Sequence, residues 1–289
     1  MENQKPVSNC RLFICPAEYW TERRVKEEIS SKENRMIKLA RKLARKKYRD
    51  EFGQFLAEGL NLIDEALRCG AGIQFVLMDQ DERSATHEAR VLEDRLRGAG
   101  IPVHAVESSL FRELADTETP QCMLGVIGKK VYTEYDIFSG DVVVLDRLQD
   151  PGNLGTILRT ADAAGFRGAI LMKGCGDVFS PKTVRATAGS IFRVPVISMD
   201  APEEAVALLK NKDYSILCTT PAGTELPYDI DMRGRIALVV GNEAGGACGY
   251  FQEHSHHLVR IPMAGPIESL NASVAAGIMM YEAVRQKSK

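Results

Sequence analysis

The chain has 289 residues, 45% of them hydrophobic and 26% charged, with seven scattered cysteines and a formal net charge of −2. These values predict one or two globular domains and exclude a disordered chain, and no apolar run reaches the roughly 18 residues of a membrane-spanning helix. Early charges argue against a secretory signal, and the odd number of cysteines without a CxxC pair predicts reduced thiols in the cytoplasm, not disulfides or a zinc site.

After a tail assigned to residues 1–30, residues 31–55 have a helical pattern. Between Lys32 and Arg49, nine Lys or Arg residues accompany one acid, Glu33, so this segment has a local charge of +8 and the remainder about −10. The apolar face holds Met36, Ala40, Leu43 and Tyr48. The basic face holds Lys38, Arg41, Lys42, Arg45, Lys46 and Arg49. A solvated helix face is one interpretation, but a stripe this dense favours contacts with nucleic-acid phosphates.

Residues 56–130 alternate helical and apolar stretches. A helix over 58–70 ends at Gly70, a strand spans 73–79, a helix spans 87–100, and two more strands span 101–107 and 121–130. The periodicity lapses over 131–141. We therefore predict a compact α/β domain over 31–135 and a second domain over 136–289.

The second domain repeats strand and helix regularly. Its predicted strands span 142–146, 168–172, 194–198, 214–220, 236–241 and 257–263, with helices over 153–165 and 203–212 among them. Short continuous runs of Val, Ile and Leu are typical of parallel strands buried on both faces. The pattern predicts a doubly wound α/β domain, in which ligands bind beyond the carboxyl ends of the strands.

The first informative strand-end loop follows residue 146. Asn153 stands where a helix N-cap is expected, and capping is the ordinary role of such a residue. Arg159 lies in the same helix among apolar residues. A guanidinium in apolar surroundings needs an anionic partner, which makes Arg159 a candidate site residue.

The second loop begins at Gly241. It contains Asn242, Glu243 and two further glycines, but it has neither GK[ST] nor GxGxxG, so a nucleoside triphosphatase or a dinucleotide fold is not indicated. Its glycines favour a backbone that passes close to a ligand.

The third loop follows the strand 257–263 and leads to Ser269 and Asn271, which flank Leu270 where a small-residue helix begins. A capping box would explain Ser269. The Ala- and Gly-rich residues 272–277 favour tight packing or a dimer surface. The one candidate metal cluster, HSHH at 254–257, fits a polar loop better.

Together the three loops resemble the motifs of SpoU-type RNA ribose 2′-O-methyltransferases of the SPOUT superfamily. The matching segments are DPGNLGTILRTADAAG (150–165), VVGNEAGG (239–246) and IPMAGPIESLNASVAAGI (261–278), in the family's order and spacing. Residues 31–130 also resemble the small ribosomal-protein-like RNA-binding domain that precedes the catalytic domain in many members.

The resemblance implies an α/β fold whose C-terminal parallel-sheet domain forms a deep trefoil knot. It implies that S-adenosylmethionine binds in this knot through main-chain atoms of Gly241, Ile261 and Leu270. Thr219, Thr220 and Met263 are expected nearby. Family members are homodimers with the active site near the dimer interface, and no metal is expected.

The resemblance also implies roles in catalysis. Arg159 would contact the substrate and help to deprotonate the 2′-hydroxyl, but arginine is a reluctant base because it stays protonated in proteins. Phosphate binding and stabilisation of the developing alkoxide are therefore its firmer roles, and proton abstraction stays open. Asn153 and Glu243 would orient this machinery, and Ser269 and Asn271 would shape the site.

The sequence thus predicts a cytoplasmic, dimeric enzyme, with no membrane segment, that methylates a ribose 2′-hydroxyl in structured RNA. The resemblance of the N-terminal domain favours ribosomal RNA over transfer RNA. The alternatives are a transfer-RNA methyltransferase and an RNA-binding protein that has lost catalysis. The presence of all five catalytic candidates argues against the loss of catalysis. A nucleotide-binding oxidoreductase would need the absent dinucleotide fingerprint.

Overall fold

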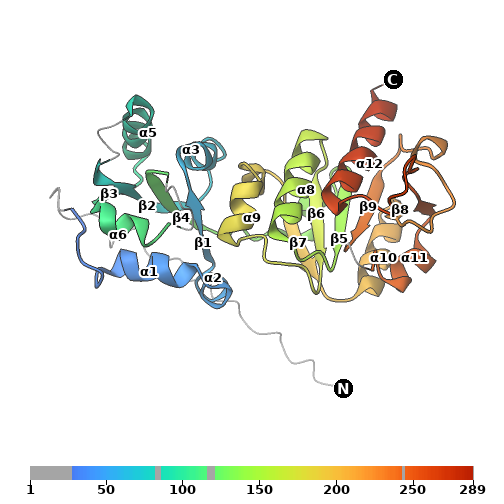
Figure 1. The fold of residues 1–289 in the computed structure, drawn as a ribbon, viewed down its shortest axis with the longest axis horizontal. Helices are drawn as coiled ribbons and strands as arrows, with labels where there is room; N and C mark the ends of the chain where they lie inside the picture. The colour runs from blue at the N-terminus through green and yellow to red at the C-terminus, as the bar shows by residue number, and fades with distance from the viewer. Residues whose placement is uncertain (1–27, 82–85, 116–120, 243–244, 289) are drawn as a thin grey trace, which may run out of the picture.

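The computed structural model describes residues 28–81, 86–115, 121–242 and 245–288. Two sheets, each with its own helices, follow one another along the chain and lie side by side along the long axis of the molecule (Figure 1). Residues 1–27 of the predicted tail and the predicted site residue Glu243 lie outside the described residues.

The first sheet is mixed, with strand order β1-β4-β2-β3. Strand β4 pairs antiparallel with both β1 and β2, and β3 pairs parallel with β2. Helices α1 and α6 pack on one face, and α3 and α5 pack on the other. The elements are β1 Gln54–Glu58, β2 Ile73–Asp79, β3 Val103–Val106, β4 Met123–Gly128, α1 Arg35–Leu43, α2 Lys46–Phe52, α3 Leu60–Arg68, α5 His87–Gly98 and α6 Ser108–Arg112.

The single helix predicted over 31–55 is wrong. The chain forms α1, breaks at Arg45 in an extended conformation, forms α2, and then enters β1. Gly53 ends α2 with a φ of 61°, a left-handed conformation that glycine adopts without strain. Strand β1 exists because its buried Leu56 pairs with Val126, 70 residues away, a contact that helical periodicity could not reveal.

The second sheet is parallel throughout, with strand order β10-β8-β9-β5-β6-β7. Helices α8 and α12 pack on one face, and α10 and α11 pack on the other, which confirms the predicted doubly wound α/β arrangement. The elements are β5 Val142–Asp146, β6 Gly168–Met172, β7 Val196–Met199, β8 Ser215–Thr219, β9 Ile236–Gly241, β10 His257–Val259, α7 Glu134–Ile137, α8 Pro151–Ala163, α9 Pro181–Ala186, α10 Pro202–Asn211, α11 Gly249–His254 and α12 Ala272–Lys287.

The two sheets are joined by a packed junction. The ring of Phe55 on β1 lies 5.0 Å from that of Phe179 and 6.2 Å from that of Phe192, measured between centroids. Arg49 on α2 reaches Asp177, which follows β6 in the second domain, at 2.6 Å. These contacts hold the N-terminal domain against the second sheet.

Within the described residues, none of the helices combines the length and the apolar composition needed to cross a lipid bilayer.

Candidate active site

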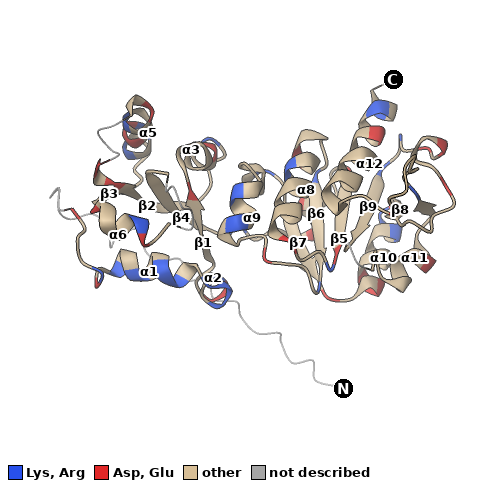
Figure 2. Ribbon diagram, viewed as in Figure 1, with Lys and Arg blue, Asp and Glu red and all other residues tan. Residues whose placement is uncertain are grey.

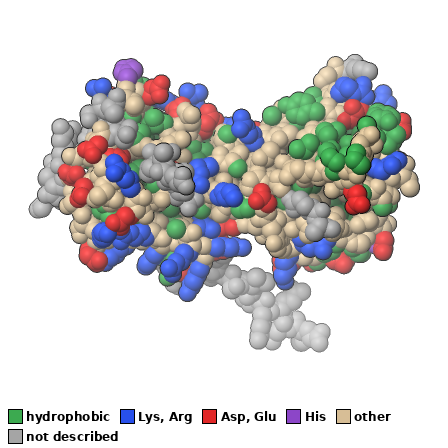
Figure 3. All heavy atoms as spheres, viewed as in Figure 1, with side chains coloured by type: hydrophobic (Ala, Val, Ile, Leu, Met, Phe, Trp, Pro, Cys, Tyr) green, Lys and Arg blue, Asp and Glu red, His purple; other side chains and the backbone are tan. Residues whose placement is uncertain are grey.

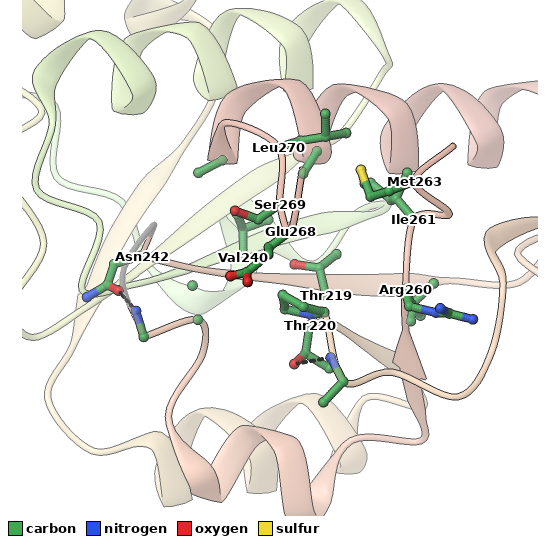
Figure 4. A pocket seen from close by; sticks show the side chains of 18 of the residues that line it. Thr219, Thr220, Val240, Asn242, Arg260, Ile261, Met263, Glu268, Ser269 and Leu270 are labelled. Carbon is green, nitrogen blue, oxygen red and sulfur yellow. Dashed lines mark hydrogen bonds between the residues drawn. The ribbon is translucent and has the colours of Figure 1, made fainter. Parts of the chain in front are cut away.

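A cavity of about 590 Å³ lies at the carboxyl ends of β8, β9 and β10 (Figure 4). Its walls are residues 219–222 after β8, the end of β9 with the loop that follows it, and the stretch from Val259 to the first turns of α12. This edge of a parallel sheet is where α/β proteins bind ligands, and the volume falls in the range of small-molecule sites.

The wall formed by residues 261–270 presents main-chain groups with no partner elsewhere in the described chain. The backbone bond before it joins the N–H of Arg260 to the carbonyl of Glu225 at 2.9 Å, and the next joins Ala275 to Asn271 at 3.0 Å. Main-chain N–H and C=O groups need partners, so the groups in between are suited to bind solvent or a ligand in the cavity. The cavity therefore combines main-chain donors and acceptors with apolar side chains such as Ile261 and Leu270.

All six residues predicted to contact the cofactor line this one cavity. They are Thr219, Thr220, Gly241, Ile261, Met263 and Leu270. The two threonine hydroxyls already have partners: Thr219 Oγ1 donates to the carbonyl of Val239 at 3.0 Å, and Thr220 Oγ1 accepts from the N–H of Ala222 at 3.4 Å. They fix the turn after β8 and leave main-chain groups and hydrocarbon facing the cavity.

The structure gives a reason for glycine at position 241 that the sequence did not indicate. A Cβ atom at this position would overlap the backbone of Gly246 and Ala247. The close neighbour of Gly241 is therefore the chain itself, which turns back after the loop. A bulky residue here would displace the loop as well as obstruct the cavity, so it could not leave the local fold intact.

Two of the predicted catalytic asparagines meet. The amide nitrogen of Asn271 donates to Oδ1 of Asn153 at 3.0 Å, across 118 residues of sequence. The predicted N-cap at Asn153 is wrong: Asp150 caps α8 and accepts from the Asn153 N–H at 2.8 Å. Asn271 itself caps α12, and Ser269, which is exposed, lines the cavity beside it.

Arg159 lies two turns into α8 and is exposed. Helix α8 buries Leu158 and Ala161 and turns Arg159 to solvent. The prediction that Arg159 needs an anionic partner because its surroundings are apolar is therefore wrong for the isolated chain. The residue does not line the cavity. The structure thus joins Asn153 to Asn271, places Ser269 in the wall of the cavity and leaves Arg159 exposed on α8.

Sequence reasoning missed the pair Asp146 and Arg147 at the end of β5. Asp146 is buried and accepts from the N–H of Cys248 at 2.6 Å, while Arg147 donates to the carbonyl of Gly246 at 3.3 Å. Arg147 has a φ of 55°, a conformation that costs a non-glycine residue energy and marks a constrained position. The pair ties β5 to the far end of the loop that borders the cavity. In the sequence, the sign of this pair was the charged dipeptide Asp-Arg at the end of a predicted buried strand.

The ionisable groups around the cavity differ in exposure. Glu268, which the sequence analysis did not single out, is exposed and lines the cavity next to Ser269. Cys218 lies behind the wall on β8, where burial raises the pKa of its thiol to about 12. This thiol stays protonated at physiological pH and is no nucleophile.

The three histidines of residues 254–257 have separate partners. Nδ1 of His254 lies 3.0 Å from the carbonyl of Tyr250, Nδ1 of His256 accepts from the N–H of Ile216 at 2.9 Å, and Nδ1 of His257 pairs with Glu225. No group of three potential metal ligands occurs among the residues that the structure describes.

The basic stripe is divided by the fold (Figure 2). Lys42, Arg45 and Lys46 are exposed, whereas Lys38 pairs with Glu33 and Arg41 pairs with Glu113 at 2.6 Å. The assignment of Arg49 to this surface is wrong. Its side chain is buried, donates to Asp177 through Nε and Nη2, and donates to the carbonyls of Leu43 and Ala44 through Nη1.

Comparison with protein families finds two matches. The SpoU rRNA Methylase family matches residues 141–281, and the MRM3-like substrate binding domain matches residues 34–125. The 23S rRNA (guanosine(2553)-2′-O)-methyltransferase RlmP of Bacillus subtilis is 33% identical over 88% of this chain and 98% of its own. An uncharacterised tRNA/rRNA methyltransferase of Synechocystis is 33% identical over 90% of this chain and 94% of its own.

Solved structures resemble about nine tenths of the chain. The AdoMet-bound rRNA methyltransferase from Sinorhizobium meliloti has a TM-score of 0.80 at 34% identity, covering 90% of this chain and 97% of its own. The SpoU methyltransferase AviRb from Streptomyces viridochromogenes, in complex with AdoMet, has a TM-score of 0.80 at 30% identity, covering 89% of this chain and 99% of its own. The matches span both domains and include the loops of the cavity. This chain belongs to the SpoU rRNA methylase family.

Proposed function

We propose that this protein transfers the methyl group of S-adenosylmethionine to a ribose 2′-hydroxyl of structured RNA, with ribosomal RNA as the substrate. The main support for this proposal is the cavity at the carboxyl ends of β8, β9 and β10, where the loops that carry the family motifs come together. Relatives that match nearly the full length are named as 23S rRNA 2′-O-methyltransferases or were solved with AdoMet.

The cavity fits S-adenosylmethionine, which would supply an activated methyl group on a sulfonium. The main-chain groups of Ile261 and Leu270, which bond to no other described residue, and the end of β9 at Gly241 suit the polar edges of a nucleoside. Met263 and the turn at Thr219 and Thr220 complete its surroundings. Because the methyl group is already activated, the protein has to position the hydroxyl and assist removal of its proton.

The catalytic roles follow from where the residues lie. Asn153 and Asn271 hold the starts of α8 and α12 together, and Ser269 lines the cavity two residues before Asn271. Arg159, exposed on α8, binds a phosphate of the RNA and stabilises the developing alkoxide. Glu243, in the loop after β9, would orient the same machinery.

The functional unit is a homodimer formed through α12. Val274, Ile278 and Tyr281 are 49%, 41% and 52% exposed and recur at helical spacing. This stripe borders α8, since Gly277 faces Thr160, the neighbour of Arg159. A second copy covering the stripe would bring Arg159 close to the partner's site. Ile278→Glu should therefore convert the dimer into monomers in analytical ultracentrifugation.

Three further assignments complete the proposal. The domains are a tail over 1–30, an RNA-binding domain over 31–135 and a methyltransferase domain over 136–289, supported by the two family matches. The chain after Gly241 threads into the deep trefoil knot of the SPOUT superfamily. The protein works in the cytoplasm, which is supported by the lack of disulfide bonds among the five described cysteines.

Methyl transfer is tested with purified protein, radiolabelled S-adenosylmethionine, and ribosomal or transfer RNA from cells that lack the gene. Label should enter ribosomal RNA, and ribose-methylation mapping with and without the gene should find one lost position. Label in transfer RNA alone would show that the substrate is transfer RNA and not ribosomal RNA. Binding of RNA without any transfer would favour a protein that has lost catalysis.

A further inference from the structure

Helix α2 carries a pair of neighbouring aromatic rings, of which Phe52 is exposed and Tyr48 is partly buried. The rings of Tyr48 and Phe52 lie with centroids 6.0 Å apart and planes within 14° of parallel, and Phe52 is 39% exposed. A single exposed aromatic residue is ordinary on a protein surface. Whether this pair indicates a binding site therefore depends on the side chains around it.

Lysines border these rings. Lys42 Nζ lies 5.6 Å from the ring centroid of Tyr48 and 5.8 Å from that of Phe52, and Lys47 Nζ lies 5.8 Å from that of Tyr48. We call Lys42, Lys47, Tyr48 and Phe52 the α2 patch. Figure 3 shows basic side chains gathered along the edge formed by α1 and α2.

The acids of α2 offset only part of this charge. Asp50 pairs with Lys129 at 2.7 Å, and Glu51 is exposed beside the patch. The exposed Arg45 and Lys46 add two more cations on the same helix and its N-cap. A cationic rim around an aromatic face is the combination by which proteins hold unpaired nucleotides, because bases stack on the rings and phosphates meet the cations.

The opposite side of α2 fixes the patch relative to the active site. Arg49 is buried and reaches Asp177, five residues beyond the end of β6 at Met172. Asp177 therefore lies near the carboxyl edge of the second sheet, the edge that also holds the cavity. The pair Arg49 and Asp177 thus ties α2 to the carboxyl edge of the sheet that bears the cavity.

We propose that the α2 patch stacks an unpaired nucleobase of the RNA substrate, while Lys42 and Lys47 contact the flanking phosphates. This inference rests on the proposed function and narrows the substrate to RNA with an unpaired nucleotide away from the methylated one. A continuous duplex offers no free base face, so it would meet only the cations.

The test compares two fluorescently labelled probes, a single-stranded oligouridylate and a perfect RNA duplex of the same length, by fluorescence anisotropy. Phe52→Ala removes the ring, and Phe52→Leu keeps the apolar volume without a π face. Tyr135→Ala is the matched control, because Tyr135 is also exposed and lies beside a lysine, Lys212, at 5.8 Å.

Both Phe52 variants should bind the oligouridylate roughly tenfold or more weakly, since base–aromatic stacking is worth about that much, and should bind the duplex within about twofold of the unaltered protein. The control should change neither. Equal losses for both probes, or full rescue by leucine, would overturn stacking. Unchanged binding of both probes would also overturn it and leave Phe52 as a contact for another protein.

Methyl transfer is measured separately, so the two proposals can fail separately. If the unaltered protein methylates no RNA but shows the stacking preference, the methyltransferase proposal fails and the α2 patch stands. If it methylates ribosomal RNA and Phe52→Ala does so equally well at limiting RNA concentration, the α2 patch fails.

Discussion

The guanidinium of Arg159 lies in solvent, so its proposed part in catalysis depends on what it contacts when RNA is bound. Arg159→Ala should leave the Kd for S-adenosylmethionine within about twofold, because Arg159 does not line the cavity. It should lower methyl transfer by about 100-fold or more, the usual loss when one stabilising donor is removed. Calorimetry and single-turnover kinetics measure the two quantities.

Arg159→Lys distinguishes charge from shape, since lysine keeps the charge but loses the planar fork. Arg233→Ala is a suitable control, because Arg233 is exposed and pairs only locally with Asp231. Near-normal turnover of Arg159→Ala would make the residue structural.

His104 links the stability of the N-terminal domain to pH. Its Nε2 is buried without a hydrogen-bond partner in the described chain, and burial, with Arg97 and Arg35 nearby, lowers its pKa. The unfolded chain therefore binds this proton at higher pH than the native one. The native state loses stability as pH falls below about 6.5, by at most about 1.4 kcal/mol per pH unit.

His104→Phe removes the titratable imidazole and places a phenyl ring beside that of Phe75. In the unaltered protein the ring centroids of Phe75 and His104 lie 6.3 Å apart. In urea unfolding at pH 7.5 and 5.5, the variant should lose less stability on acidification than the unaltered protein. Identical losses would mean that carboxylates alone set the acid sensitivity of the domain.

At the scale of elements, α1 and α2 are expected to supply RNA affinity without chemistry. Replacing Lys38, Lys42, Arg45 and Lys46 by Gln preserves helix propensity and removes four exposed cations. If all four meet phosphates of a duplex, the slope of log affinity against log salt should become shallower by about 3–4 units. S-adenosylmethionine binding should not change.

A matched variant removes four exposed cations elsewhere, namely Arg90, Lys210, Arg233 and Arg285. It should keep most of the salt slope. An equal change in both variants would show that the dependence reflects overall charge and that the stripe is only a solvated surface.

The sequence predicted some elements better than others for a physical reason. Strands β2, β5, β6 and β9 have the predicted bounds because continuous apolar runs are a local property of buried strands. The first strand was missed because pairing with β4, not its own pattern, makes it a strand. The loops of the cavity could be found from glycine and asparagine, but the burial of Arg49 depends on Asp177, 128 residues away.

At the scale of the whole molecule, the pair Arg49 and Asp177 is expected to set the orientation of the two domains. Arg49→Met should destabilise the protein by about 3–5 kcal/mol, because it leaves a largely buried carboxylate without its partner. Arg49→Met combined with Asp177→Leu should recover much of that stability, since no unpaired charge remains.

The double variant separates stability from orientation. If the pair aligns the RNA surface with the cavity, the stable double variant should still show a raised KM for RNA and unchanged S-adenosylmethionine affinity. A double variant with normal kcat/KM would reduce the pair to a structural contact.

The strand order also has a consequence for synthesis on the ribosome. The N-terminal sheet has all its strands once Gly128 is made, whereas β5 at the centre of the second sheet must wait for its neighbour β9, which ends at Gly241. Translation of the residues from 129 to 241, about 110 in number, takes roughly 6–23 s at ordinary rates. During that interval the nascent chain already has a folded domain with the basic residues of α1 and α2 but no methyl-donor cavity, so it can meet RNA before it can modify it.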